Sequence, residues 1–113
     1  MFDAVVIVSD EDSLIETLDR FDPDLVVVDL SFQVVRESNA AVLLNRYDPE
    51  LKFIVLSTYE EQEIMKDCMS SGASGYVLKR SAGRDLIAAV EEVLKGDTFV
   101  SPSISLANEN ITP

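Results

Sequence analysis

Histidine is absent from this chain of 113 residues, and cysteine occurs only once. Without imidazole, the chain has no His–Ser or His–Cys catalytic pair, no imidazole metal ligand and no histidine phosphocarrier. The single thiol, Cys68, excludes an internal disulfide and is typical of a reducing compartment. Any chemistry must therefore come from carboxylates, hydroxyls, lysines and backbone amides.

Basic residues are also scarce: nine Lys and Arg stand against 21 Asp and Glu, for a net charge of −12. Such a surface repels phosphate backbones, so we expect no nucleic-acid binding by this chain alone. No apolar run approaches the roughly 18 residues of a membrane span, and the N-terminus lacks the basic region of a signal peptide. We therefore expect a cytoplasmic protein.

Two kinds of enzyme motif are missing as well. The chain has no glycine-rich loop that could cradle a phosphate and no G-x-S-x-G elbow. Together with the lack of histidine, this predicts that the chain is not an enzyme.

The length fits one domain with its own hydrophobic core. Four short apolar runs are typical of strands buried on both faces, and amphipathic segments separate them. This alternation predicts an α/β fold with a parallel sheet and helices on both faces. The predicted strands are Ala4–Val8, Leu25–Val28, Phe53–Leu56 and Gly75–Leu78.

The predicted helices follow from apolar residues at helical spacing and from capping signals. Thr58 and Glu61 form a capping-box pattern, and Cys68, Met65 and Met69 lie on an apolar helix face. From Ser101 onward the chain is polar and contains proline, which indicates a linker or a frayed end. The predicted helices run from Ser9 to the residues before Pro23, from about Ser38 to Tyr47, from Thr58 to Ser70 and from Ala82 to Lys95.

Polar side chains stand at the ends of the four predicted strands: Asp10, Asp29, Ser57 and Lys79. The carboxyl ends of parallel strands meet at one rim of the sheet, where such folds place their sites. Carboxylates suit Mg²⁺, and a hydroxyl and a lysine suit the oxygens of a phosphoryl group. Asp10 could equally be only a helix cap.

Three segments resemble the strands around the site of a response-regulator receiver domain of the CheY-like, flavodoxin-like fold. They are VVVDL (Val26–Leu30), VLST (Val55–Thr58) and SGASGYVLK (Ser71–Lys79). The last segment and GDTFVSP (Gly96–Pro102) resemble the NarL/LuxR-type branch, whose output is a DNA-binding helix-turn-helix. The resemblance covers about Phe2 to Ser103.

The resemblance implies a two-component phosphorelay in which Asp29 accepts a phosphoryl group from a sensor histidine kinase. Ser57 would bind the phosphoryl oxygen, Lys79 would pair with the phosphate or with Asp29, and Tyr76 would be the aromatic switch. Mg²⁺ would be held by Asp29 and, in a weakened site, by Asp10. The output would be transcription regulation.

The same resemblance divides the chain into a receiver domain over residues 1–103 and a linker or frayed tail over residues 104–113. The tail would lead toward a helix-turn-helix output domain, since Asn110–Pro113 resembles the start of a NarL-like DNA-binding domain. DNA would then be bound by that domain and not by this chain.

One strand–helix unit of the family pattern is missing before Asp29, and two placements of Ala4–Val8 compete. In the first, this strand is the usual second strand, and the centre of the sheet is empty. In the second, it lies beside Asp29 and the sheet has four strands in order. Hydrogen bonding favours the second, because a strand beside a gap cannot pair its backbone.

Either placement leaves one sheet face uncovered beside the last helix, which predicts a homodimer or a strand-exchanged oligomer. The turn after Asp29 also lacks the proline and glycine that the family usually has there. These departures keep an alternative open. The chain could be a degenerate receiver that works as a phosphorylation-independent dimerisation or protein-interaction module.

Overall fold

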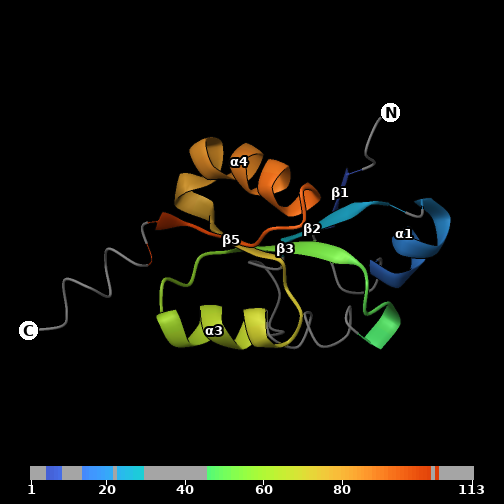
Figure 1. The fold of residues 1–113 in the computed structure, drawn as a ribbon, viewed down its shortest axis with the longest axis horizontal. Coiled ribbons are helices and arrows are strands. Elements are labelled where there is room, and N and C mark those ends of the chain that lie inside the picture. Colours follow the sequence, from blue (N-terminus) through green and yellow to red (C-terminus); the bar gives the residue numbers. More distant parts are fainter. Residues whose placement is uncertain (1–4, 9–13, 22, 30–45, 103, 105–113) are drawn as a thin grey trace, which may run out of the picture.

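The fold is an α/β arrangement built on one parallel sheet, shown by a computed structural model (Figure 1). The structure describes residues 5–8, 14–21, 23–29, 46–102 and 104. The elements are β1 (Val5–Val8), α1 (Leu14–Phe21), β2 (Leu25–Asp29), β3 (Lys52–Ser57), α3 (Gln62–Ser70), β4 (Gly75–Leu78), the short 3₁₀ helix η1 (Lys79–Ser81), α4 (Ala82–Leu94) and β5 (Phe99–Val100).

The strands follow one another across the sheet in the order β1-β2-β3-β4-β5, and every pair is parallel. β1 pairs with β2 over its whole length, from Val5 opposite Leu25 to Val8 opposite Val28. The structure therefore has the second placement of the first strand, with no gap beside Asp29. The predicted number of four strands was wrong, because the two-residue strand β5 adds a fifth beside β4.

The predicted strands agree with the observed ones to within one residue at each end. In β2, β3 and β4 the apolar side chains alternate between the two faces of the sheet and are buried on both. One cluster contains Val26, Val28, Phe53, Val55, Tyr76 and Leu78, and the other contains Leu25, Val27, Ile54, Leu56 and Val77.

Helices lie on both faces of this sheet (Figure 1). Leu18 of α1 and Cys68 of α3 pack in the first cluster, while Ala89 and Val93 of α4 pack in the second. Each strand lies beside the previous one in the same direction across the sheet, but α4 covers the face opposite to the one that α1 and α3 cover. The β4–α4–β5 crossover therefore has the opposite handedness to the β1–α1–β2 and β3–α3–β4 crossovers, although nearly all such crossovers share one hand.

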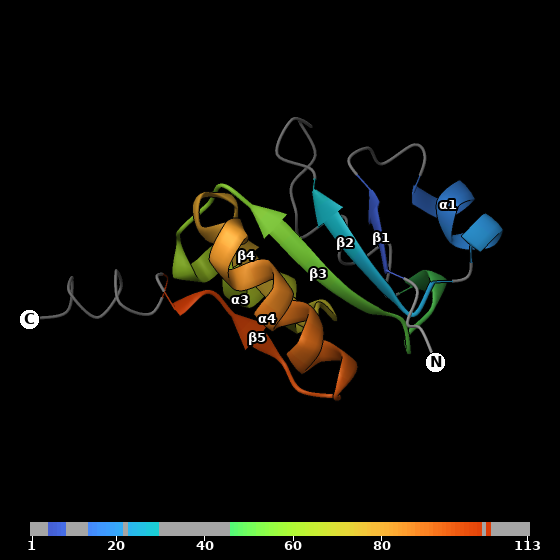
Figure 2. The same ribbon diagram turned by 90° about the horizontal axis from the view of Figure 1, so that it is seen from above.

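The sheet face under α4 is open at its β1 side. Val5 and Ile7 stand level with Leu25 and Val27 of that face, and they are 41% and 60% exposed. Viewed from above, α4 lies over the β3–β5 side of the sheet and leaves β1 uncovered (Figure 2). The apolar face predicted beside the last helix is thus present.

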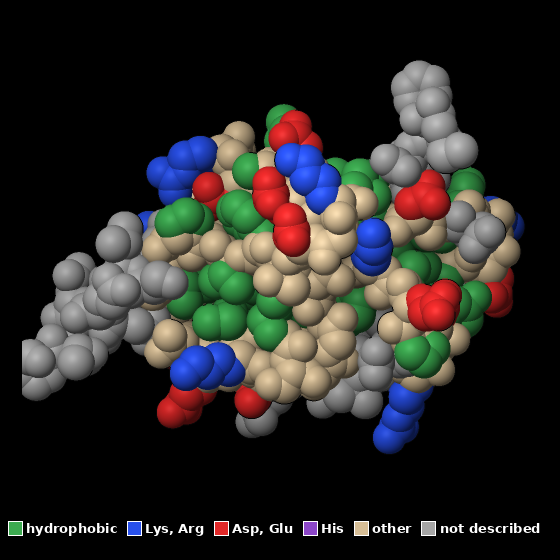
Figure 3. Space-filling model, viewed as in Figure 1, with side chains coloured by type: hydrophobic (Ala, Val, Ile, Leu, Met, Phe, Trp, Pro, Cys, Tyr) green, Lys and Arg blue, Asp and Glu red, His purple; other side chains and the backbone are tan. Residues whose placement is uncertain are grey.

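Hydrophobic side chains also reach the surface over the other edge of the sheet. Figure 3 shows them between α4 and α3, in front of β5. Both residues of β5 are half-buried. Each edge strand therefore exposes part of its apolar side chains.

Glycines end two of the helices, and the predicted capping box is absent. Gly72 and Gly96 end α3 and α4 in the left-handed conformation, with φ of 115° and 100°, and their N–H groups bond to Met69 and Val93. The predicted capping box at Thr58 was wrong. α3 begins at Gln62, since Glu61 is extended and is the N-cap residue, and Thr58 to Glu61 form a loop.

Two further predictions need correction or lie outside the described residues. Tyr47, the last residue of the helix predicted from about Ser38, is 41% exposed, and its hydroxyl bonds to Asp19. Most of the helix predicted before Tyr47 lies outside the described residues. The tail was expected to begin at Ser101, yet Ser101 and Ile104 are fully buried.

No described helix is long and apolar enough to cross a membrane.

Candidate functional site

The described part of the site lies at the carboxyl ends of β2, β3 and β4. Asp29 ends β2 opposite Leu56, and Ser57 ends β3 opposite Leu78. Lys79 follows β4 directly. The parallel register therefore brings the predicted carboxylate, hydroxyl and ammonium groups to one rim, as the sequence predicts.

Asp29 and Lys79 form an ion pair across this rim. Their Oδ2 and Nζ atoms are 3.3 Å apart, and their side chains are only 15% and 28% exposed. Partial burial weakens solvent screening, so this pair is held more firmly than a surface pair. The strand between them, β3, sets the spacing that Lys79 must span.

Ser57 is fully buried, and its Oγ accepts a hydrogen bond from the backbone N–H of Tyr59 at 3.0 Å. Tyr76 is also fully buried, and its hydroxyl donates to the backbone carbonyl of Tyr59 at 2.7 Å. Both side chains thus bind the same residue of the β3–α3 loop. Ser57 and Tyr76 are therefore linked through the backbone of Tyr59.

A second ion pair on this rim was missed from the sequence. Arg80 Nη2 lies 2.5 Å from Glu60 Oε1 and joins the turn after β4 to the β3–α3 loop. Both side chains are about half exposed. The signal was available, since Glu60 and Arg80 each lie within three residues of a predicted site residue, but Glu60 falls inside the helix predicted from Thr58 to Ser70.

Only part of the predicted metal site can be placed. Asp29 supplies one carboxylate, while Asp10 lies outside the described residues. The described chain leaves β1 at Val8, directly beside Val28, the residue before Asp29. Within the described residues no three Asp, Glu, Cys or His side chains gather into a metal-binding group.

A buried polar group beside β4 was also missed. Asp85, in the first turn of α4, is 4% exposed, and Arg84 Nε lies 3.1 Å from its Oδ1. Its other oxygen, Oδ2, is buried and has no hydrogen-bond partner among the described residues. Burial raises the pKa of this carboxyl, but the guanidinium of Arg84 and the polar groups around the carboxyl outweigh burial, so the net pKa is lowered from its ordinary value. Asp85 is therefore ionised at neutral pH.

The rim presents the partly buried carboxylate of Asp29, the ammonium group of Lys79 3.3 Å away, and the hydroxyl of Ser57 at the end of the neighbouring strand. A carboxylate oxygen can attack phosphorus, and a lysine can stabilise the charge that develops on the phosphoryl oxygens. No histidine or thiol of the chain competes for this chemistry, because the chain has no histidine and Cys68 is buried.

Comparison with known sequences agrees with this geometry. The sequence model of the response regulator receiver domain matches residues 1–91. The transcriptional regulatory protein DegU of Brevibacillus brevis is 30% identical over 105 residues, which are 92% of this chain and 44% of DegU. The oxygen regulatory protein NreC of Staphylococcus carnosus is 33% identical over 91 residues, or 77% of this chain and 42% of NreC. The chain thus spans less than half the length of these relatives.

Solved structures show the same fold. A LuxR-family two-component response regulator from Aurantimonas sp. SI85-9A1 superposes with a TM-score of 0.84 at 20% identity, covering 98% of this chain and 99% of that one. The isolated receiver domain of RcsB from Salmonella enterica serovar Typhimurium gives 0.78 at 21% identity, covering 96% and 99%. With the family match over most of its length, the chain belongs to the response regulator receiver domains.

Proposed function

We propose that Asp29 is the phosphoacceptor of this receiver domain. The observation that carries the proposal is the half-buried ion pair between Asp29 and Lys79 at the carboxyl end of the sheet. A partly buried carboxylate with a cation in contact is poised to accept a group whose new charge the same cation can bind. A helix-capping role for Asp29 would not require Lys79.

In the proposed reaction, a carboxylate oxygen of Asp29 attacks the phosphorus of a phosphohistidine on a sensor kinase. The N–P bond breaks, an acyl phosphate forms on Asp29, and the histidine keeps the electron pair of that bond. Lys79 already lies against Oδ2 and stabilises the charge on the phosphoryl oxygens. The partner of this chain would therefore be a sensor histidine kinase.

The new charge would act on the β3–α3 loop. Ser57 Oγ is engaged with Tyr59 N–H, and its hydroxyl proton can be offered to a phosphoryl oxygen on Asp29. Any shift of Tyr59 must move with Tyr76, because the Tyr76 hydroxyl holds the Tyr59 carbonyl. The loop and Tyr76 would therefore switch together.

A divalent cation is part of the proposal. Mg²⁺ prefers one or two carboxylates with phosphate oxygens and waters, and Asp29 supplies one such carboxylate. Asp10 would be the second ligand. When bound, Mg²⁺ would neutralise charge as the phosphoryl group arrives.

The proposed output is transcriptional and lies beyond this chain. The relatives are regulatory proteins more than twice as long as the matched region. The net charge of −12 makes direct contact between this chain and DNA unfavourable. We therefore propose a cytoplasmic signalling module without enzymatic activity, whose phosphorylation controls a DNA-binding domain attached to it.

We also propose that the chain forms a homodimer through the open side of β1. Val5 and Ile7 expose apolar surface on an edge strand, where backbone groups can pair with another chain. Light scattering after size-exclusion chromatography should give a dimer at micromolar concentration, and Ile7→Lys should give a monomer. A clean monomer for the unaltered chain would contradict this proposal.

The phosphoacceptor is tested by incubating the chain with Mg²⁺ and a small phosphodonor and measuring the intact mass. The unaltered chain should gain one phosphoryl group, and Asp29→Asn should gain none. Asp67→Asn removes an exposed carboxylate of α3 and should behave like the unaltered chain. A folded chain that gains no phosphoryl group would favour the phosphorylation-independent interaction module.

A further inference from the structure

The residue after β5, Ser101, is bonded to β4 through both its backbone and its side chain. Its N–H donates to the carbonyl of Tyr76 at 2.9 Å, and its Oγ accepts from the N–H of Leu78 at 3.0 Å. Ser101 is fully buried. The side-chain oxygen continues the parallel ladder that the two-residue strand β5 begins.

The two residues that Ser101 binds are connected to opposite sides of the candidate site. Leu78 immediately precedes Lys79, which holds Asp29. Tyr76 holds the β3–α3 loop through the carbonyl of Tyr59. Ser101 is therefore bonded to the residue that precedes Lys79 and to the backbone of Tyr76.

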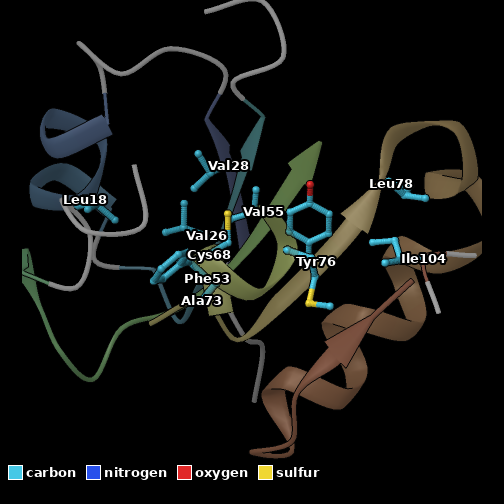
Figure 4. Packing of buried hydrophobic residues seen from close by; sticks show 11 residues of the cluster. Leu18, Val26, Val28, Phe53, Val55, Cys68, Ala73, Tyr76, Leu78 and Ile104 are labelled. Atoms are coloured by element: carbon cyan, nitrogen blue, oxygen red, sulfur yellow. The ribbon is translucent and has the colours of Figure 1, made fainter. Parts of the chain in front are cut away.

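The described residues beyond Ser101, Pro102 and Ile104, lie against it. The backbone is helical at Pro102, and the N–H of Ile104 donates to the carbonyl of Ser101 at 3.0 Å. Ile104 is fully buried in the cluster that contains Tyr76 and Leu78 (Figure 4). Serine followed by proline is a typical helix start, so the segment changes from strand to helix at Ser101.

Ser101 is also the acceptor that the buried end of β4 depends on. Displacing Ser101 from β4 would leave the N–H of Leu78 buried without this acceptor, so β4 and Ser101 should move together.

From these contacts we propose that Ser101, Pro102 and Ile104 form the coupling segment through which a change at Asp29 and Lys79 reaches the chain that follows Ile104. This inference rests on the proposed function of Asp29. The signal passes from Lys79 and Tyr76 to the backbone of β4, and from there through the two hydrogen bonds of Ser101 to Ile104. Ser101 is a positioning residue in this scheme, since it does not touch the phosphoryl group.

The test is amide hydrogen exchange measured by NMR on the whole chain, with and without Mg²⁺ and beryllofluoride. Fluorine NMR of bound fluoride reports occupancy of Asp29 separately. With the site occupied, exchange at the amides of Leu78, Ser101 and Ile104 should change by about fivefold or more, a typical coupling between two sites. Bound beryllofluoride with unchanged exchange at Ser101 and Ile104 would overturn the inference.

Ser101→Ala separates coupling from stability. This variant should still bind beryllofluoride, but the response of the Ile104 amide should be much smaller while that of Leu78 remains, because only the backbone bond of residue 101 to Tyr76 is left. Ser70→Ala, which removes an exposed hydroxyl from α3, is the matched control and should keep the full response. An Ile104 response of full size in Ser101→Ala would contradict the role of Ser101.

If beryllofluoride does not bind, the proposed function is refuted, but the coupling segment can still be tested by a second perturbation. Asp29→Asn weakens the contact with Lys79 without touching the core, so it should change exchange at Leu78 and Ile104. In the double variant with Ser101→Ala the change at Ile104 should be much smaller. If Asp29→Asn alters Leu78 but leaves Ile104 unchanged, the coupling segment is refuted. This arm also decides the question if Ser101→Ala does not fold.

Discussion

The two halves of the sheet differ in how completely they are covered. β3 and β4 have α3 on one face and α4 on the other, and the interiors of both strands are buried. At the β1 side, Val5 and Ile7 are 41% and 60% exposed, and Phe21 of α1 is 59% exposed. One half is a closed core and the other is an open edge.

This difference shows which half of the sheet holds the site residues in place. Ser57, Tyr76 and Lys79, the predicted site residues that follow Asp29 along the chain, all come from the covered half. Their positions are fixed by buried neighbours and by bonds to Tyr59 and Asp29. The open half offers apolar surface instead, which suits association with another chain.

The largest expected contrast comes from truncating a buried side chain in the covered half. Phe53 is 1% exposed, so Phe53→Ala should lower the free energy of unfolding by about 3–5 kcal/mol, through lost burial and the cavity left behind. Ile7→Ala, in the open half, should cost only about 0.5 kcal/mol in a monomeric chain. Urea denaturation measures both. Similar losses for the two variants would erase the distinction between the halves.

A smaller effect is expected where β4 packs tightly against β3. A Cβ added at Gly75 would lie 3.0 Å from Cγ1 of Ile54 and 3.5 Å from the carbonyl of Phe99. Gly75→Ala should therefore cost about 1–3 kcal/mol. Gly83→Ala, in α4, meets no atom within 4 Å and should stabilise the helix by up to about 1 kcal/mol. A neutral Gly75→Ala in thermal denaturation would show that β3 and β4 can move apart easily.

A pH-dependent effect is expected at the junction of α4 with β4. The folded-state pKa of Asp85 lies below 3.8, so its ionised form stabilises the fold above that pH. This contribution is lost as the pH falls through the folded-state pKa. At neutral pH, Asp85→Asn should cost on the order of 1 kcal/mol, and the gap should close in acid.

Urea denaturation between pH 7 and acid measures this gap for the unaltered chain and for Asp85→Asn. Asp97→Asn, an exposed position, serves as the control. A gap that stays constant down to the lowest pH would mean that the charge of Asp85 contributes nothing.

The smallest effect is expected at the exposed ion pair between Arg80 and Glu60, with side chains 58% and 46% exposed. Solvent screens such pairs, so Arg80→Gln should cost at most about 1 kcal/mol, and the cost should vanish at high salt. Lys66→Gln, an exposed residue of α3, is the control. A loss of several kcal/mol would place Arg80 among the structural residues of the covered half.

Much of this arrangement could be predicted from the sequence. The apolar runs located β1 to β4 because strands buried on both faces need continuous hydrophobic residues. The rule that sites lie at the carboxyl ends of parallel strands brought Asp29, Ser57 and Lys79 together. Hydrogen bonding alone selected the correct neighbour for β1.

What escaped prediction depended on tertiary contacts. β5 is only two residues long, too short for a periodic pattern, and it forms because Gly75 and Tyr76 offer an open edge. Ser101 and Ile104 were assigned to a tail because their polar neighbours hid the two buried side chains. Tyr59 contributes through its backbone, which no side-chain pattern reveals.

The central claim is that Asp29, with Lys79 against it, receives the phosphoryl group. Fluorine NMR of a beryllofluoride titration in the presence of Mg²⁺ tests it most directly, with the unaltered chain and Asp29→Asn measured side by side. The account predicts Mg²⁺-dependent bound-fluoride signals that saturate at one adduct per chain and are absent in Asp29→Asn. Equal signals from the two chains, or none from the folded unaltered chain, would contradict it.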